Sequence, residues 1–476
     1  MKYFFTLILL SVITYTVSAQ TEVSGTQSGT WNMDGSPYLV TGEVTVPAGE
    51  TLNIEPGVTV NFQGHYKLTV NGTLTVEGTE QDSIFFTTDD PETGWHGIRL
   101  TGSQSGSHFA YCRFEYGKTS GSEFPDMHGG AIMMNESDAV MEHCLFINNE
   151  AFGEDNGMGG AIYGLNTTPA TQITYCSFLN NHTYGEGGAI KFSGDTGADI
   201  EYCIFKDNTV LYGGGAICLY GCYDTHIFRS LFTGNITSYS SGGAVFIEGY
   251  CSRIRFVNCT IFDNHATGGD GGGIEIAFSD ASFTNSIIYN NPGAYSDNIY
   301  LDFGYAEVNY CNTPFPDGAE GSHNINTNAQ FVDETTGDFH LQPDSPCVDA
   351  GIDFLEITDA YGDTFVVIDL DPSEYYNTAP DMGCYEYDPG VGIQKATLET
   401  VDIYPNPAKS VCRINLNKTY DKVYLIMTDI SGKTVMQKEY NGIKNIDLDI
   451  MPLPDGVYMI QMNGDGATGS FKILKQ

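Results

Sequence analysis

The most evident shortage in the sequence is of basic side chains: its 476 residues contain 20 Lys+Arg against 60 Asp+Glu, for a formal net charge of −40. Such a surface repels polyanions over about a Debye length, so we expect no nucleic-acid partner. The shortage is uneven, because residues 20–396 hold 10 basic and 51 acidic residues whereas residues 397–476 hold 9 of each. This change in charge predicts a domain boundary near residue 397.

Two kinds of segment are also missing. After residue 19 no apolar run is long enough to span a bilayer, so we expect no transmembrane segment. No stretch of ten or more residues repeats apolar residues at a helical spacing, which disfavours a helical repeat. Residues 1–19 combine Lys2, an apolar run and small residues before Gln20, which is the pattern of a signal peptide. We therefore expect an exported protein.

What the sequence has in abundance is repetition. Between His128 and Asn291, six copies begin with two glycines, a small residue and a branched residue, and the branched residues are 30, 28, 27, 28 and 29 positions apart. Each copy ends in a second motif, Cys or Ser, then Phe or Ile, then a turn residue and Asn. Its apolar position holds Phe146, Phe178, Phe205, Phe232, Ile261 and Ile288. A fixed period of this length indicates a repeat architecture.

The composition of each copy predicts strands. Short alternating runs of β-branched and aromatic residues are separated by Gly, Asn and Asp, and the paired Asn positions suit tight turns. A copy of three strands cannot bury its apolar face alone, but stacked copies share a continuous core. Parallel crossovers are nearly always right-handed. We therefore predict an all-β fold, a right-handed parallel β-helix, in which the phenylalanines form one ladder and Cys144, Cys176, Cys203 and Cys259 form another.

Alternating strands from Tyr38 onward, with Gly94–Ile98, resemble the opening coils of secreted right-handed β-helix repeat proteins. Segments Gly337–Gln342, Ser345–Gly351 and Asp381–Glu386 resemble the closing segment of the same family. We expect that segment to cap the open end of the stacked core. The expected organisation is a signal peptide at 1–19, the β-helix at 20–342, its cap at 343–388, a linker at 389–399 and a last domain at 400–476.

The last domain has its own motifs, Tyr404-Pro405-Asn406-Pro407, then Gly432-Lys433, then Gly456-Val457-Tyr458. From these residues it resembles the type A C-terminal sorting domain of the type IX secretion system. The resemblance implies a small immunoglobulin-like β-sandwich and the type IX secretion machinery as a partner. It also implies transit through the periplasm to the outer cell surface or the medium. The residues that carry the sorting motif are Tyr404, Pro405, Asn406, Pro407, Gly432, Lys433, Gly456 and Tyr458.

Twelve cysteines in an exported protein raise the question of disulfides. The ladder cysteines are expected to pack as small buried hydrophobes, because parallel in-register side chains do not converge as a bridge requires. The pairs Cys222 with Cys251, and Cys347 with Cys384, are left as either bridges or thiols. No Cys/His spacing indicates zinc.

Acidic loops precede several of the double glycines, and stacking would align their carboxylates along one edge. The edge is either solvated or a set of calcium ligands, and no other cofactor is indicated. The candidate calcium ligands are Asp126, Glu154, Asp155, Glu186 and Asp270. Asp349 and Asp381, near the end of the β-helix, are a second candidate pair for a metal.

No complete catalytic set is present. On the presumed outward face, Lys191 and Glu275 are expected to align with Met133, Tyr163, Cys218 and Phe246. Lys191 is a candidate base for a lyase, and Glu248 with Glu275 are candidate carboxylates for a hydrolase.

Two functions remain open. One is a monomeric surface protein that binds a polysaccharide or another surface ligand, and the other is a polysaccharide lyase or glycoside hydrolase. Three aromatic residues that could stack on sugars, Tyr163, Tyr220 and Phe246, suit both. The missing catalytic set favours binding.

Overall fold

The computed structural model describes residues 20–101, 106–121, 124, 126–152, 157–358, 362–388, 401–404, 408–429, 434–454, 456–464 and 467–475. The all-β prediction is confirmed, since the described residues form strands and one three-residue 3-10 helix, Met33–Gly35. None of them belongs to a helix long and apolar enough to cross a membrane. The chain divides into two units, residues 1–387 and 388–476. The expected signal peptide and linker lie outside the described residues.

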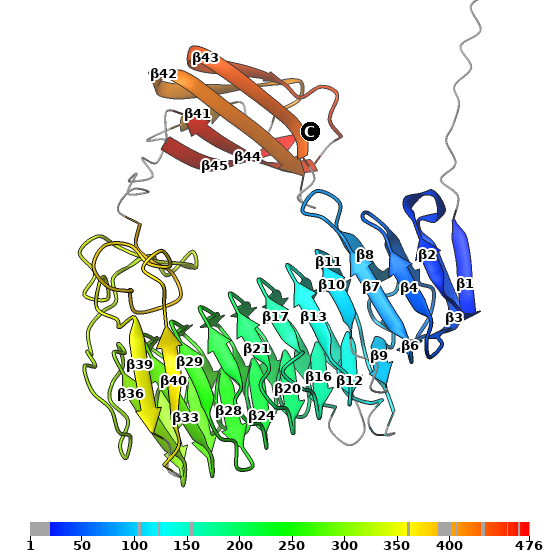
Figure 1. The fold of residues 1–476 in the computed structure, drawn as a ribbon. Helices are drawn as coiled ribbons and strands as arrows, with labels where there is room; N and C mark the ends of the chain where they lie inside the picture. Colours follow the sequence, from blue (N-terminus) through cyan, green and yellow to red (C-terminus); the bar gives the residue numbers. More distant parts are fainter. Residues whose placement is uncertain are drawn as a thin grey trace, which may run out of the picture. The chain divides into compact units, whose positions relative to one another are not determined.

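Parallel strands stack coil upon coil in the first unit (Figure 1), and the largest sheet holds two strands of every coil. The strands in the double-glycine register are Leu68–Val70 (β6), Ile98–Thr101 (β9), Ile132–Asn135 (β12), Ile162–Leu165 (β16), Ile190–Ser193 (β20), Ile217–Tyr220 (β24), Val245–Glu248 (β28), Ile274–Ala277 (β32) and Ile299–Asp302 (β35). The strands in the Cys-x-Phe register are Thr59–Phe62 (β5), Ile84–Thr88 (β8), Cys112–Glu115 (β11), Leu145–Ile147 (β14), Ser177–Leu179 (β18), Ile204–Lys206 (β22), Leu231–Thr233 (β26), Thr260–Phe262 (β30) and Ile287–Tyr289 (β34). Thr21–Thr26 (β1) and Tyr38–Val46 (β3) begin this sheet.

A second parallel sheet supplies a third strand to each coil. Its members are Gly29–Trp31 (β2), Thr51–Ile54 (β4), Thr73–Glu77 (β7), Ser107–Ala110 (β10), Ala139–Glu142 (β13), Gln172–Thr174 (β17), Asp199–Glu201 (β21), His226–Phe228 (β25), Ile254–Val257 (β29), Asp280–Thr284 (β33) and Tyr305–Asn309 (β36). Five coils add a two-residue strand that the sequence did not predict: Glu150–Ala151 (β15), His182–Thr183 (β19), Thr209–Val210 (β23), Ile236–Thr237 (β27) and His265–Ala266 (β31).

The predicted phenylalanine ladder is confirmed and is longer than expected. Phe86 and Phe114 lie below Phe146, so that six rings stack with centroids 4.7–4.9 Å apart. All six are fully buried in the central core. The predicted cysteine ladder is buried beside them, and all twelve cysteines are buried thiols. The two pairs left open in the sequence are therefore not bridged.

The two residues of each paired turn have different structural roles. The first of each pair has left-handed backbone, as at Asn148 and Asn180 with φ of 55° and 53°. The second is a buried asparagine whose Oδ1 accepts hydrogen bonds from the asparagine of the coil before it. This asparagine ladder contains Asn149, Asn181, Asn208, Asn235, Asn264 and Asn291. It satisfies the backbone at a corner where no sheet can.

The double glycine is required by close packing between coils. The first glycine, such as Gly187 with φ of 70°, takes a conformation that side chains disfavour. The second has no room, because a Cβ on Gly188 would lie 2.0 Å from the carbonyl oxygen of Gly215. The double glycines thus let the turns of successive coils lie directly above one another in the same register.

The closing segment packs beside the coils. Its described residues, 331–358 and 362–387, contain two antiparallel hairpins that lie against the sides of the last coils. Their strands are Phe331–Asp333 (β37), Asp338–Leu341 (β38), Phe354–Thr358 (β39) and Thr364–Asp369 (β40). Phe331 and Phe339 contact Phe262, and Val367 on β40 belongs to the same apolar cluster as Val257 on β29. Bridges Glu307–Glu320 and Asn312–Ile325 continue the stack beyond β36.

The physical reason is in the outer faces of the coils. Several outward residues of the last coils are apolar, among them Phe228, Leu231, Val257 and Phe262, and these cluster with apolar residues of the closing segment. Figure 1 shows β40 beside β29 and β33, and β39 pairs with β40. The segment covers these apolar sides and is not confined to an end.

The second unit is an antiparallel domain with its own core, as the resemblance implied. Its strands are Val401–Tyr404 (β41), Val411–Asp429 (β42), Thr434–Asp449 (β43), Gly456–Gly464 (β44) and Ala467–Lys475 (β45). Of the sorting-motif residues, Tyr404 ends β41 and is half exposed, and Gly456 begins β44. Tyr458 is buried, and its hydroxyl donates to the Pro454 carbonyl at 2.8 Å. Pro405, Asn406, Pro407, Gly432 and Lys433 lie outside the described residues.

Candidate functional site

One row of outward residues crosses the largest sheet as the sequence predicted. Successive strands pair Arg99, Met133, Tyr163, Lys191, Cys218, Phe246, Glu275 and Tyr300 in register. The row is largely covered, since Lys191 is only 2% exposed and Tyr163 only 3%. Tyr163 stacks on His128 with ring centroids 4.5 Å apart. Of the three aromatic residues expected to meet sugars, Tyr163 is therefore hidden, Phe246 is half-buried and Tyr220 is exposed.

The structure brings two catalytic candidates together. Lys191 Nζ lies 2.5 Å from Glu186 Oε2, 3.5 Å from Glu248 Oε1 and 3.1 Å from Cys218 Sγ. We call these four residues the lysine cluster. Burial opposes the charge, but Cys218, Glu186 and Glu248 outweigh it and raise the pKa of Lys191 above its ordinary value. A lysine held protonated in this way is a poor proton acceptor at neutral pH.

Glu275 lies on β32, the strand after β28, and is not part of the lysine cluster. It is 7% exposed, and its Oε2 has no hydrogen-bond partner. Burial raises the pKa of Glu275 to about 8, and Asp302 and Asp270 add to the effect. The carboxyl is thus largely protonated at neutral pH. Glu248 and Glu275 lie at different positions along paired strands, as the sequence indicated.

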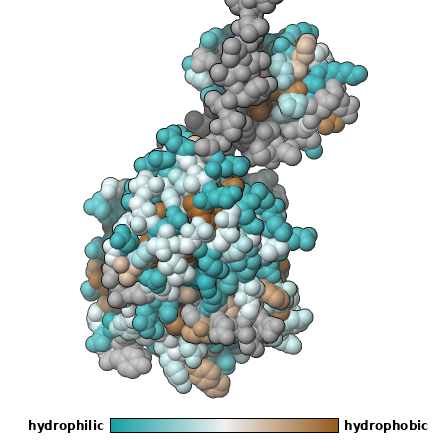
Figure 2. Space-filling view, turned by 90° about the vertical axis from the view of Figure 1, so that its right-hand side faces the viewer, coloured by the Kyte–Doolittle hydropathy of each residue, from teal (hydrophilic) through white to brown (hydrophobic). Residues whose placement is uncertain are grey.

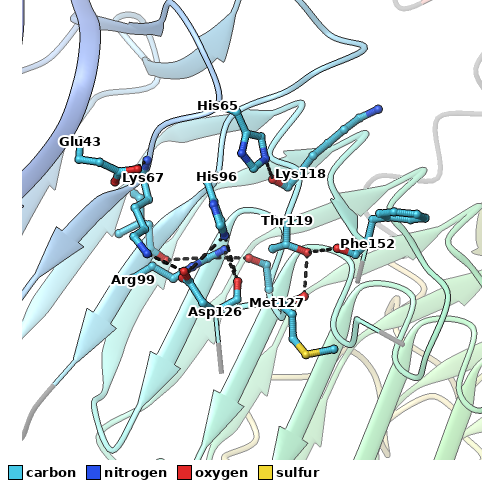
Figure 3. A network of polar contacts seen from close by, with 12 residues as sticks. Glu43, His65, Lys67, His96, Arg99, Lys118, Thr119, Asp126, Met127 and Phe152 are labelled. Atoms are coloured by element: carbon cyan, nitrogen blue, oxygen red, sulfur yellow. Dashed lines mark hydrogen bonds and ion pairs between the residues drawn. The ribbon is translucent and has the colours of Figure 1, made fainter. Parts of the chain in front are cut away.

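A second network surrounds Asp126, shown in Figure 3. Its carboxylate accepts hydrogen bonds from Lys67 Nζ at 2.5 Å and Arg99 Nε at 3.0 Å, and His96 Nε2 lies 3.7 Å away. The Arg99 side chain also donates to the carbonyl of Gly129. Burial lowers the pKa of His96 to about 4, so the ring is neutral at pH 7. The network fastens the loop before the first double glycine to the two preceding coils.

The acidic edge is therefore partly neutralised by the chain itself. Asp126 forms an ion pair with Lys67, and Glu186 forms one with Lys191. Asp270 is half-buried, and its backbone N–H donates to the Ser241 hydroxyl. Glu154 and Asp155 lie outside the described residues, and calcium binding stays a prediction. The second candidate metal pair accepts backbone hydrogen bonds: Asp381 from the N–H of Asp349, and Asp349 from those of Thr378 and Ala379. Metal binding by this pair also stays a prediction.

Sequence reasoning missed a row of rings at the corner between the second sheet and the Cys-x-Phe strands. Tyr111, His143, Tyr175 and Tyr202 stack with centroids 4.6, 4.9 and 4.7 Å apart, and Arg229 continues the row. All five have left-handed backbone. The signal was present, because each residue immediately precedes the Cys or Ser of the repeat motif. We call these five residues the corner row.

The corner row leads into a pocket of about 500 Å³ between the coils and the closing segment. Tyr175, which is 51% exposed, and Tyr202 form one wall. The remaining lining includes Tyr375, Tyr376, Tyr385, His340, Glu374 and Glu386. We call this the closing pocket; its volume lies in the range of ordinary ligand sites, and five tyrosines are among its lining residues.

Polar groups in the closing pocket converge on Arg229. Its Nη2 donates to the Glu374 carbonyl at 2.7 Å and lies 3.6 Å from Glu386 Oε1. Its buried Nε has no partner. Burial, reinforced by Asp381, raises the pKa of Glu386 to about 7. The pocket therefore offers donors and a carboxyl that is near half protonation at neutral pH.

Sequence reasoning also missed one cluster on the second sheet, formed by Asp199, Glu201 and His226. Burial, followed by Arg255, lowers the pKa of His226 to about 4. No motif spacing indicates the cluster, because Asp199 and His226 are 27 residues apart and meet only by stacking.

One face of the β-helix unit is mostly polar. Figure 2 views the molecule from the side on which β1 and β3 lie in Figure 1, and the face of the β-helix unit seen there is mostly hydrophilic with small separate hydrophobic areas.

Comparisons with known proteins agree with this architecture. The family described as "Right handed beta helix region" matches residues 53–235 and 188–329, which together span more than half of the chain. The "Secretion system C-terminal sorting domain" matches residues 402–476. Among solved structures, ORF18 of Geobacillus virus E2 aligns with 88% of this chain and 71% of its own, with 12% identity and a TM-score of 0.22. No curated protein matches the chain.

Proposed function

Because the chain belongs to the right-handed β-helix family and ends in a secretion system C-terminal sorting domain, we propose that this secreted protein binds an uncharged glycan in the closing pocket. One observation carries the proposal: a half-open pocket of about 500 Å³ combines exposed aromatic rings with hydrogen-bonding groups. Sugars bind proteins through such combinations, with ring faces or edges against their C–H groups and polar side chains at their hydroxyls.

The rings of the corner row cover one another's faces, so outside the pocket they offer edges and phenol hydroxyls. We propose that a longer glycan runs along these edges and places one end in the closing pocket. An uncharged chain is favoured because residues 20–396 carry 51 acidic side chains, and because the charge of Arg229 is already engaged by Glu386.

Binding can be tested with the purified full chain on a panel of neutral and acidic glycans, followed by calorimetry on any hit. Tyr175→Ala and Tyr385→Ala should each weaken binding at least tenfold, because each removes a pocket ring. Tyr239→Ala is the matched control, since this tyrosine is 71% exposed and lies outside the pocket. Equal losses in all three variants would contradict the proposal.

Hydrolysis is the second candidate, and two carboxyl groups in the pocket favour it. Glu386 has a raised pKa suited to a general acid, and Glu374 lies in the same lining. The same panel should then be scored for released reducing ends. Release that Glu386→Gln abolishes while binding persists would identify an enzyme. Binding without release would leave the protein a binding module.

A further inference from the structure

The Asp199, Glu201 and His226 side chains project from neighbouring strands of the second sheet. Asp199 and Glu201 lie two residues apart on β21, so they share its outward face, and His226 on β25 pairs directly with Asp199. His226 Nδ1 is 3.8 Å from Asp199 Oδ1 and 3.9 Å from Glu201 Oε1. One atom of each residue lies within 4.8 Å of the other two.

These contacts are too long for hydrogen bonds, so the three ligand atoms lie close together without a direct bond between them. Within the part of the chain that the structure describes, no lysine or arginine forms an ion pair with either carboxylate. Arg255, the register neighbour of His226 on β29, has its guanidinium bound by Asp224 at 3.0 Å and by the carbonyl of Val366. The point between the three ligand atoms is therefore not filled by a cation of the described chain.

The lysine cluster provides a contrast. Glu186, Cys218 and Glu248 also converge within 4.8 Å, but Lys191 Nζ lies among them at 2.5–3.5 Å. In that cluster a buried lysine balances the two carboxylates. The cluster on the second sheet has the same convergence and lacks the lysine.

A second histidine on the same sheet supplies a control. His108 meets Glu77 through Nδ1 at 3.5 Å and Glu142 through Nε2 at 3.3 Å. Its two nitrogens therefore face two carboxylates on opposite sides, and no single point is shared by all three residues. That arrangement suits a pair of ion contacts and not a metal.

We propose that Asp199, Glu201 and His226 form a binding site for a divalent transition-metal ion, with zinc as the best match. An imidazole nitrogen and two carboxylate oxygens are ordinary zinc ligands, at about 2.0–2.2 Å each. In tetrahedral coordination two such ligand atoms lie about 3.4 Å apart, so atoms now 3.8 and 3.9 Å apart need to approach each other by only about half an ångström to bind one ion. Calcium is excluded as the preferred ion because it takes oxygen ligands only.

The side chains of His226, Asp199 and Glu201 are 21%, 38% and 32% exposed. The fourth coordination position of a tetrahedral ion would therefore be open to solvent. Protein ligands from two neighbouring coils would then tie β21 to β25. The site is independent of the glycan proposal, because none of the three residues lines the closing pocket.

The test is calorimetric titration of zinc into the chelator-treated full chain, purified without a histidine tag. The expected result is one ion per chain at this site. His226→Ala and the isosteric Glu201→Gln should each weaken zinc binding at least tenfold, whereas His108→Ala should not. All twelve cysteines are buried, so surface thiols do not compete. Circular dichroism on each variant confirms that the fold persists.

Cobalt(II) then identifies the ligands by absorption. The proposed site should give visible d–d bands without thiolate-to-cobalt charge transfer, and Glu201→Gln should remove them. Thiolate charge transfer would place the ion at Cys218 and overturn the proposal. So would the absence of zinc binding, or binding that survives both substitutions at the site.

Discussion

A single buried asparagine stabilises three coils at once. Asn208 Oδ1 accepts from the backbone N–H and the side-chain amide of Asn181, both at 2.9 Å, and its Nδ2 donates to the Phe178 carbonyl and to Asn235 Oδ1. It is fully buried, so no water replaces these bonds when they are lost.

Asn208→Ala should therefore lower the free energy of unfolding by roughly 2–4 kcal/mol, because it leaves a buried N–H and a buried carbonyl unsatisfied. Urea denaturation followed by circular dichroism measures the loss. Asn326→Ala, at an exposed position, is the control and should change the midpoint little. Similar midpoints for the two variants would mean that the ladder contributes no net stability.

Glu275 makes the β-helix sensitive to pH. Its folded-state pKa of about 8 lies above its ordinary value of 4.5, so the folded chain binds this proton more tightly than the unfolded chain does. The resulting stability is fully present below pH 4.5 and is lost as the pH rises through 8. Asp195 and Glu386, with pKa values raised by burial to about 6 and 7, act in the same direction.

Glu275→Gln should therefore raise the melting temperature at pH 8 by several degrees and flatten its decline between pH 5 and 8. Thermal melts across that range measure both effects. The surface substitution Glu356→Gln should reproduce the wild-type profile. A Glu275→Gln profile parallel to wild type would show that this carboxyl does not titrate as described.

At the scale of strands and turns, the second glycine of each copy sets how closely coils approach. A methyl group on Gly188 would lie 2.0 Å from the Gly215 oxygen, a clash with backbone that only displacement of a coil relieves. Gly25 is the opposite case, because its φ is positive, 68°, but a Cβ there meets nothing within 4 Å.

Gly188→Ala should thus cost roughly 3 kcal/mol or more. Gly25→Ala should cost only the strain of left-handed backbone, about 1–2 kcal/mol. Denaturation midpoints of the two variants give the comparison. If Gly25→Ala proved the more damaging, packing between coils would not be the reason for the double glycine.

The repeat period made the coils predictable, because every copy has the same double glycine, apolar ladder position and terminal asparagine. The corner row was predictable in principle from Tyr175 and Tyr202 before their cysteines, but those rings lie outside the core that the periodicity describes. The closing segment carries no repeat, so its packing against the coils depends on distant apolar partners such as Phe262. The Asp199–His226 contact likewise arises only from stacking.

At the scale of the whole molecule, the chain consists of two separately cored units with different charges. The β-helix unit carries nearly all of the excess acid, and the sorting domain is balanced. The domain directs the protein across the outer membrane to the cell surface or the medium. The polar residues of the β-helix surface suit an extracellular protein that must stay soluble.

Deletion of residues 388–476 should therefore separate folding from export. The β-helix core contains only residues of the first unit, so the truncated protein should retain β-type circular dichroism and a cooperative melt. It should accumulate in the periplasm, because the sorting domain has been removed. Cell fractionation of the native host, with the intact chain expressed in parallel, measures the distribution.

A matched fusion protein distinguishes loss of the signal from damage to the passenger. Residues 388–476 joined to an unrelated folded protein that enters the periplasm should carry that protein to the surface or medium. Folding of the truncated β-helix together with export of the fusion would assign the sorting function to the second unit alone. If the truncated protein still reached the surface, the export signal would lie within the β-helix unit, and the second unit would not be the sorting domain of this protein.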